Sequence, residues 1–97
     1  MIVLLAQLRI KPGKSKEFKE LAKVSVQATR KQKGCISYQL LADSYDDNVV
    51  FFVDEWESME LLKDHGEADH VKKFMEQIKD LVVSSSVRVY NAQAISM

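Results

Sequence analysis

The sequence predicts an α+β fold of the ferredoxin-like type, β-α-β-β-α-β, with both helices on one face of a four-stranded antiparallel sheet. Three observations predict it. Apolar residues alternate in four segments, helical spacing separates the first segment from the second and the third from the fourth, and turn residues lie between elements. The chain of 97 residues has room for one domain, over 1–97.

The first strand is expected over 2–10, where every second residue is apolar. Pro12 and Gly13 break it. Ser15 is expected to cap the following helix, and Gly34 to end that helix in the left-handed conformation. The stripe that recurs at helical spacing is Phe18, Leu21, Ala22, Ser25, Ala28 and Thr29.

A hairpin is expected next, with strands over 36–43 and 49–56 joined by turn residues at 46–48. The second arm is apolar on both faces, which indicates burial on both sides. Ser58 is expected to cap a short helix that Gly66 interrupts. A second helical segment runs from about Asp69.

The final strand is expected within 82–95. The sheet face opposite the helices then carries too many apolar side chains to remain in water. They include Val3, Leu5, Val49, Phe51 and Val53. We therefore expect a homodimer in which this face is covered.

Charge and composition exclude several classes of partner. Fourteen Lys and Arg balance fourteen Asp and Glu, so the chain has no electrostatic footprint for nucleic acid. No apolar run approaches the roughly 18 residues that span a membrane. No secretory signal is recognisable, and the single cysteine, Cys35, cannot form an internal disulfide, so we expect a cytoplasmic protein.

The two histidines, His65 and His70, are five residues apart, roughly 140° around an uninterrupted helix. Paired metal ligands on a helix prefer spacings of three or four, so no metal site is predicted. A kink at Gly66 could still bring both rings toward one cavity. His65 could instead satisfy carbonyls at a helix end, and His70 could be a surface residue. A helix N-terminus favours neutral imidazole, which would let His70 accept a proton.

Other polar side chains punctuate the apolar strands. Asp54 and Glu55 point to opposite faces, so they form no paired-carboxylate site, and one of them faces the interior and needs a partner. Trp56 ends the same strand. Gln7 and Tyr38 stand in mid-strand, where they could meet a small aromatic ligand or bond to each other. No Gly-rich phosphate loop, Rossmann fingerprint or CxxC motif exists, so no nucleotide or flavin site is predicted.

The motifs KPGK at 11–14, GCISY at 34–38 and FVDEWES at 52–58, followed by His65 and His70, resemble the antibiotic biosynthesis monooxygenase (ABM) domain family. The resemblance covers nearly the whole chain. It implies a homodimeric α+β barrel. It also implies a cofactor-independent monooxygenase that oxidises a small quinol or aromatic phenol with molecular oxygen.

By position, the resemblance places Trp56, His65 and His70 at the substrate cleft, with Gln7 and Tyr38 as further candidates. His70 is expected at the mouth of this cleft as the catalytic base, and the other four residues are expected to bind substrate. Two alternatives stay open. One is a non-catalytic dimeric binding module for a small hydrophobic metabolite. The other is an isomerase of a phosphorylated signalling molecule, which would need a cation such as Arg9 or Arg88 at the cleft.

Overall fold

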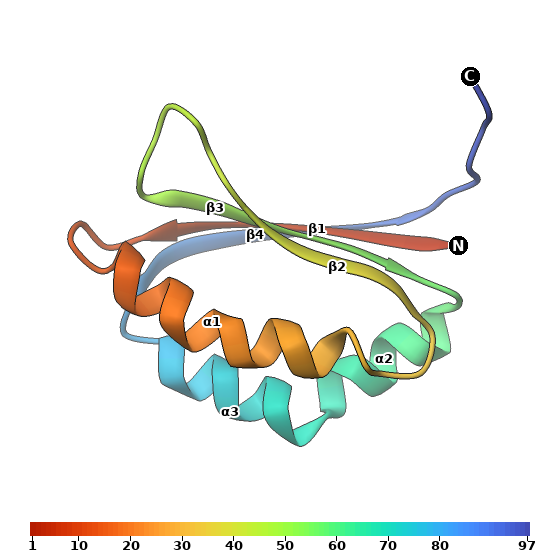
Figure 1. The fold of residues 1–97 in the computed structure, drawn as a ribbon, viewed down its shortest axis with the longest axis horizontal. Coiled ribbons are helices and arrows are strands. Elements are labelled where there is room, and N and C mark those ends of the chain that lie inside the picture. The colour runs from red at the N-terminus through yellow and green to blue at the C-terminus, as the bar shows by residue number, and fades with distance from the viewer.

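The structure, a computed structural model of residues 1–97, places three helices on one face of a four-stranded antiparallel sheet (Figure 1). The elements are β1 (Ile2–Ile10), α1 (Ser15–Thr29), β2 (Cys35–Ala42), β3 (Val49–Trp56), α2 (Met59–Glu67), α3 (Asp69–Ile78) and β4 (Val82–Asn91). The strand order is β2-β3-β1-β4. This confirms the predicted ferredoxin-like class, with the second helical region divided in two.

The register of the sheet decides which side chains meet the helices. Ala6 of β1 lies opposite Phe52 of β3 and Val87 of β4. Because side chains alternate along a strand, the even-numbered residues of β1 and β3 face the helices. Ile10 and Val50 are fully buried there, whereas Gln7 is exposed on the other face.

Aromatic rings fill the layer between sheet and helices. Phe18 of α1, Phe52 of β3 and Phe74 of α3 form a triangle with ring centroids 5.8 to 6.3 Å apart. All three are buried. Edge and tilted contacts of this kind stabilise a core beyond the area that they bury, so they hold α1 and α3 against the sheet.

The two predicted termini of the first helix are wrong. Ser15 is the first residue of α1 and makes no cap, because its Oγ donates to the carbonyl of Asp47 at 3.0 Å. The helix ends at Thr29, well before Gly34. Gly34 does adopt a positive φ of 84°, but it shapes the turn into β2. There its carbonyl accepts the N–H of Glu57 at 2.9 Å.

The predicted cap of α2 is confirmed, because Ser58 Oγ accepts the N–H of Leu61 at 3.2 Å. The predicted break at Gly66 is wrong, since Gly66 lies within α2. The chain turns instead at Ala68, whose backbone is extended (φ −65°, ψ 142°). Its carbonyl accepts from Val71 and Lys72, both at 3.1 Å, and so starts α3 without help from a side chain.

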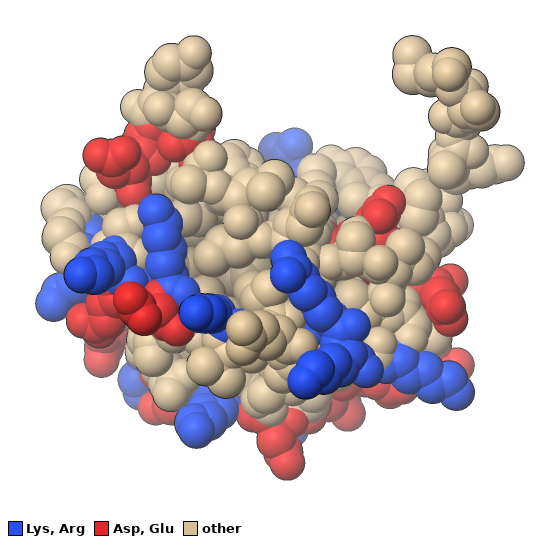
Figure 2. All heavy atoms as spheres, viewed as in Figure 1, with Lys and Arg blue, Asp and Glu red and all other residues tan.

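The surface shows charges of both signs over the helices and a mostly uncharged region over the sheet (Figure 2). On the face of the sheet away from the helices, apolar side chains are partly or largely exposed in the single chain. They are Val3, Leu5, Leu41, Phe51, Val53 and Tyr90, which we call the open-face patch. The β2–β3 loop and the C-terminal end project on this side (Figure 1). None of the helices has the length and apolar character needed to span a membrane.

Candidate functional site

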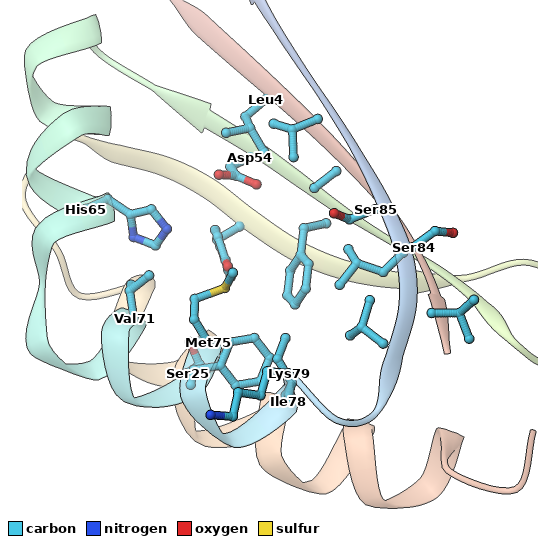
Figure 3. Close-up of a pocket in the computed structure, with 18 residues that line it drawn as sticks. Leu4, Ser25, Asp54, His65, Val71, Met75, Ile78, Lys79, Ser84 and Ser85 are labelled. Carbon is cyan, nitrogen blue, oxygen red and sulfur yellow. The ribbon is translucent and has the colours of Figure 1, made fainter. Parts of the chain in front are cut away.

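A cavity of about 420 Å³ lies between the sheet and the helices (Figure 3). This volume is in the range of small-molecule sites. The apolar part of its wall consists of Leu4, Ala6, Leu8, Phe52, Val71, Phe74, Met75, Ile78, Val82, Val83 and Val87. Met75, Val83 and Val87 are more than half exposed, so the cavity opens between α3 and the edge strand β4.

Asp54 is the buried acid of the cavity. Its side chain is 1% exposed, and Figure 3 shows the carboxylate directed from β3 into the space between sheet and helices. Trp56 Nε1 donates to Oδ2 at 3.0 Å, whereas Oδ1 has no hydrogen-bond partner. Burial raises the pKa of Asp54 to about 6, although the hydrogen bond from Trp56 acts in the opposite direction.

His65 faces Asp54 from α2 and is buried. Its Nδ1 lies 2.7 Å from Gln32 Oε1. Because an amide oxygen only accepts, Nδ1 carries the proton and Nε2 is left as an acceptor. Burial, helped by nearby His70, lowers the pKa of His65 to about 4. The imidazole is therefore neutral near pH 7, and it packs on Trp56 with ring centroids 4.8 Å apart.

Tyr38 completes the polar end from β2. Its ring is buried and lies 5.4 Å from the ring of His65. Burial, followed by the negative charge of Asp54, raises the pKa of the Tyr38 hydroxyl well above its usual range. The phenol therefore keeps its proton and can act as a donor toward a bound oxygen atom.

The predicted site residues lie in three different places. Tyr38 and His65 line the cavity. Trp56 is fully buried behind it and holds Asp54. Gln7 lies on the opposite face of the sheet, in a separate hollow of about 140 Å³.

His70 also lies outside the cavity wall. Its Nε2 is 2.9 Å from Thr29 Oγ1, and its ring is 6.2 Å from that of His65. The turn at Ala68 brings the two imidazoles together by placing them on separate helices. His70 is therefore not among the residues that line the cavity, and its place at the mouth of the cleft stays a prediction.

Asp54 and Ser25 were missed as site residues. Ser25 is 3% exposed, lines the cavity from α1 and has no partner for its Oγ. The signal for Asp54 was the strand alternation, which puts Asp54 on the same face as the buried Phe52. The signal for Ser25 was its place on the inward stripe of the first helix.

No three His, Cys, Asp or Glu side chains gather into a group that could hold a metal ion. Cys35 lies near the polar end of the cavity and is partly buried. Burial, followed by the charge of Asp54, raises the pKa of its thiol, so Cys35 stays protonated and unreactive.

Comparison with known proteins gives consistent matches. A sequence model of the family described as "Antibiotic biosynthesis monooxygenase" matches residues 1–77. The uncharacterized protein sll1783 of Synechocystis is 29% identical over 90 residues, and the match covers 92% of this chain but 61% of that protein. The chain thus spans less than two thirds of this relative.

"Probable quinol monooxygenase YgiN" of Escherichia coli is 25% identical over 100 residues, with 92% of this chain and 95% of YgiN covered. A solved structure described as an antibiotic biosynthesis monooxygenase superimposes with a TM-score of 0.90 at 25% identity. It covers 97% of this chain and 100% of its own. From its sequence and its fold, the chain belongs to the antibiotic biosynthesis monooxygenase family.

Proposed function

We propose that this protein is a monooxygenase that oxidises a small quinol or aromatic phenol with molecular oxygen and needs no resident metal or organic cofactor. One observation carries the proposal: an apolar cavity whose polar end brings together a buried carboxyl group, a neutral imidazole and a phenol hydroxyl. The family match and the relative named as a quinol monooxygenase support it.

The electron balance explains why such a reaction can run without a reductant. A dihydroxyarene and O₂ give a hydroxyquinone and water. One oxygen atom enters the ring, the other leaves as water, and the substrate supplies all four electrons. The protein then has to favour the electron-rich phenolate and exclude water, which buried polar groups in an apolar cavity can do.

Each polar group has a role in this scheme. Tyr38 donates a hydrogen bond to a substrate oxygen, and His65 Nε2 accepts one from a substrate hydroxyl. Trp56 forms the wall behind them. A base must reach the proton that it removes, and His70 does not line the cavity, although its ring lies 6.2 Å from that of His65. We therefore assign His70 a positioning role in place of the predicted catalytic one.

Oxygen uptake with a panel of reduced naphthoquinones tests the proposal directly. We expect turnover that persists after treatment with a chelator, with a product that carries one more oxygen atom and two fewer hydrogen atoms than the quinol. Val87→Phe narrows the cavity from the edge strand and should lower kcat/KM by about tenfold or more. The matched control is Val24→Phe, at a 69% exposed position of α1 outside the cavity, which should leave kcat/KM unchanged.

The binding module is the second outcome of the same experiment. If no quinol supports oxygen uptake while an oxidised quinone still quenches Trp56 fluorescence, the protein binds such ligands without turnover. The phosphorylated-substrate isomerase has less support. Arg9 bonds to Asp46 at 3.3 Å, and Arg88 borders the hollow on the opposite face, so neither of the two expected arginines reaches the cavity. Lys79 does line the cavity, but it is paired with Glu76 at 2.7 Å.

A further inference from the structure

We propose that Asp54 takes the phenolic proton of the substrate and that Ser25, on the opposite wall, holds a second oxygen of the same molecule. The site would therefore select planar aromatic compounds with two oxygen substituents. This inference rests on the proposed function and adds to it the base and the class of substrate.

The first support is an unused acceptor on a deeply buried acid. Asp54 Oδ2 is engaged by Trp56, whereas Oδ1 is buried without a partner. A buried polar atom left without a hydrogen bond destabilises the fold, and native structures contain few of them. Since Asp54 lines the cavity, a ligand hydroxyl can supply the missing donor.

The second support is another buried polar atom without a hydrogen-bond partner, on the helical side of the cavity. Ser25 Oγ is also buried without a partner, and Ser25 lines the same cavity from α1. Figure 3 shows Ser25 on the helical wall and Asp54 on the sheet wall. A ligand with one oxygen atom can satisfy only one of these atoms. A ligand with oxygens at two ends of a flat ring system can satisfy both.

The proton transfer is a simple exchange. The phenolic O–H bond breaks, a new O–H bond forms at Asp54 Oδ1, and the ligand becomes a phenolate with both electrons of the broken bond. With its pKa raised to about 6, the Asp54 carboxylate is a stronger base than an ordinary one and is still mostly ionised at pH 7.

Few other charges compete for this proton. The other titratable or charged groups along the cavity or near its polar end are Tyr38 and Cys35 from β2, Arg30 beside Cys35, His65 from α2, His70 next to His65, and Lys79 directly after α3. Tyr38, Cys35 and His65 are neutral near pH 7. Lys79 bonds to Glu76 at 2.7 Å. The parts of β1, β4 and α1 that line the cavity present no titratable side chain.

Asp54→Asn tests the base, because it keeps the shape and can still accept from Trp56. We expect kcat for a quinol to fall by about 10²-fold or more, and Asp54→Glu to restore part of it. The wild-type kcat/KM should rise with pH through about pH 6, the pKa of Asp54, and the Asn variant should lose this rise. A variant with the wild-type rate and pH profile would overturn the assignment.

Ser25→Ala tests the second contact without any turnover. By calorimetry, wild type should bind a dihydroxynaphthalene about fivefold to tenfold more tightly than the naphthol with one hydroxyl, as expected for one neutral hydrogen bond. Ser25→Ala should remove this preference while binding of the naphthol persists. Equal affinities for the two ligands in wild type would overturn the inference, and thermal melting of each variant verifies folding.

These outcomes separate the inference from the proposed function. If quinols are oxidised but Asp54→Asn has no effect, the function stands and the inference fails. If no quinol is oxidised but Ser25→Ala removes the preference for the diol, the ligand class stands and the oxygenase proposal fails.

Discussion

Burial raises the pKa of Asp54 above its ordinary value and lowers the pKa of His65 below its ordinary value, so both side chains favour their neutral forms. Asp54 titrates near 6 in the folded protein and near 3.8 when unfolded. Between pH 3.8 and about 6, Asp54 is more often protonated in the folded state than in the unfolded state, so its contribution to stability falls as pH rises. His65 titrates near 4 when folded and 6.5 when unfolded, so its contribution rises with pH over nearly the same interval.

Asp54→Asn should therefore stabilise the protein at neutral and alkaline pH. Above about pH 6 it removes the cost of a buried charge, and we expect a gain of up to about 3 kcal/mol in the free energy of unfolding. The gain should disappear near pH 4, where Asp54 is protonated in the folded state. Urea unfolding at the two pH values measures it, and an equal effect at both would contradict the shifted pKa.

His65→Gln should show the opposite dependence. In wild type the contribution of His65 to stability falls as pH drops from 6.5 to 4, because unfolding lets His65 take up a proton. The variant has no group at position 65 that titrates in this range. The free energy of unfolding of wild type relative to that of the variant should therefore fall as the pH is lowered toward 4. In wild type the slopes of Asp54 and His65 offset each other, and a pH series of unfolding midpoints for both variants would reveal them separately.

Gly34 couples the turn before β2 to α2, the helix that carries His65. A Cβ at this position would overlap the side chain of Leu61, in addition to the strain of a φ of 84°. Gly34→Ala should destabilise the protein by more than about 2 kcal/mol. Gly13→Ala is the matched control, because it has a similar φ of 81° with no atom near the added Cβ.

The Gly13 variant should cost only the backbone strain, about 1 kcal/mol. The difference between the two midpoints of thermal unfolding reports the close packing of the turn on α2. If both variants lose the same stability, the contact with Leu61 contributes nothing beyond the strain.

Patterns in single elements predicted the fold well and the chemistry less well. Strand alternation and helical spacing identify the elements because they report which face is buried. The start of α1 and the break at Ala68 escaped prediction, because a hydrogen bond from Ser15 to a distant turn decided the first and a backbone carbonyl decided the second. His70 was selected because imidazole is a common catalytic base. Whether its side chain lines the cavity depends on how α3 packs against α1, which the sequence pattern does not specify.

The open-face patch makes a homodimer our expectation for the whole molecule. A flat apolar face of this kind typically buries roughly 800 Å² per partner, which suffices for stable association. Phe51→Lys lies in this patch and should convert the dimer to a monomer by placing a charge in the interface. Val24→Lys, on the exposed side of α1, should leave the mass unchanged. Sedimentation or light scattering at micromolar concentration measures both, and a monomeric wild type would contradict the expectation.

The division of the cavity wall between elements has a consequence for how this protein can diversify. The carboxyl group, the imidazole and the phenol of the polar end belong to β3, α2 and β2, whereas the exposed rim, with Met75, Val83 and Val87, belongs to α3 and an edge strand. Substitutions at the rim can change the size of the guest molecule while the acid, the imidazole and the phenol keep their geometry. Substitutions that accumulate at the rim could thus widen or narrow the range of aromatic substrates while the reaction stays the same.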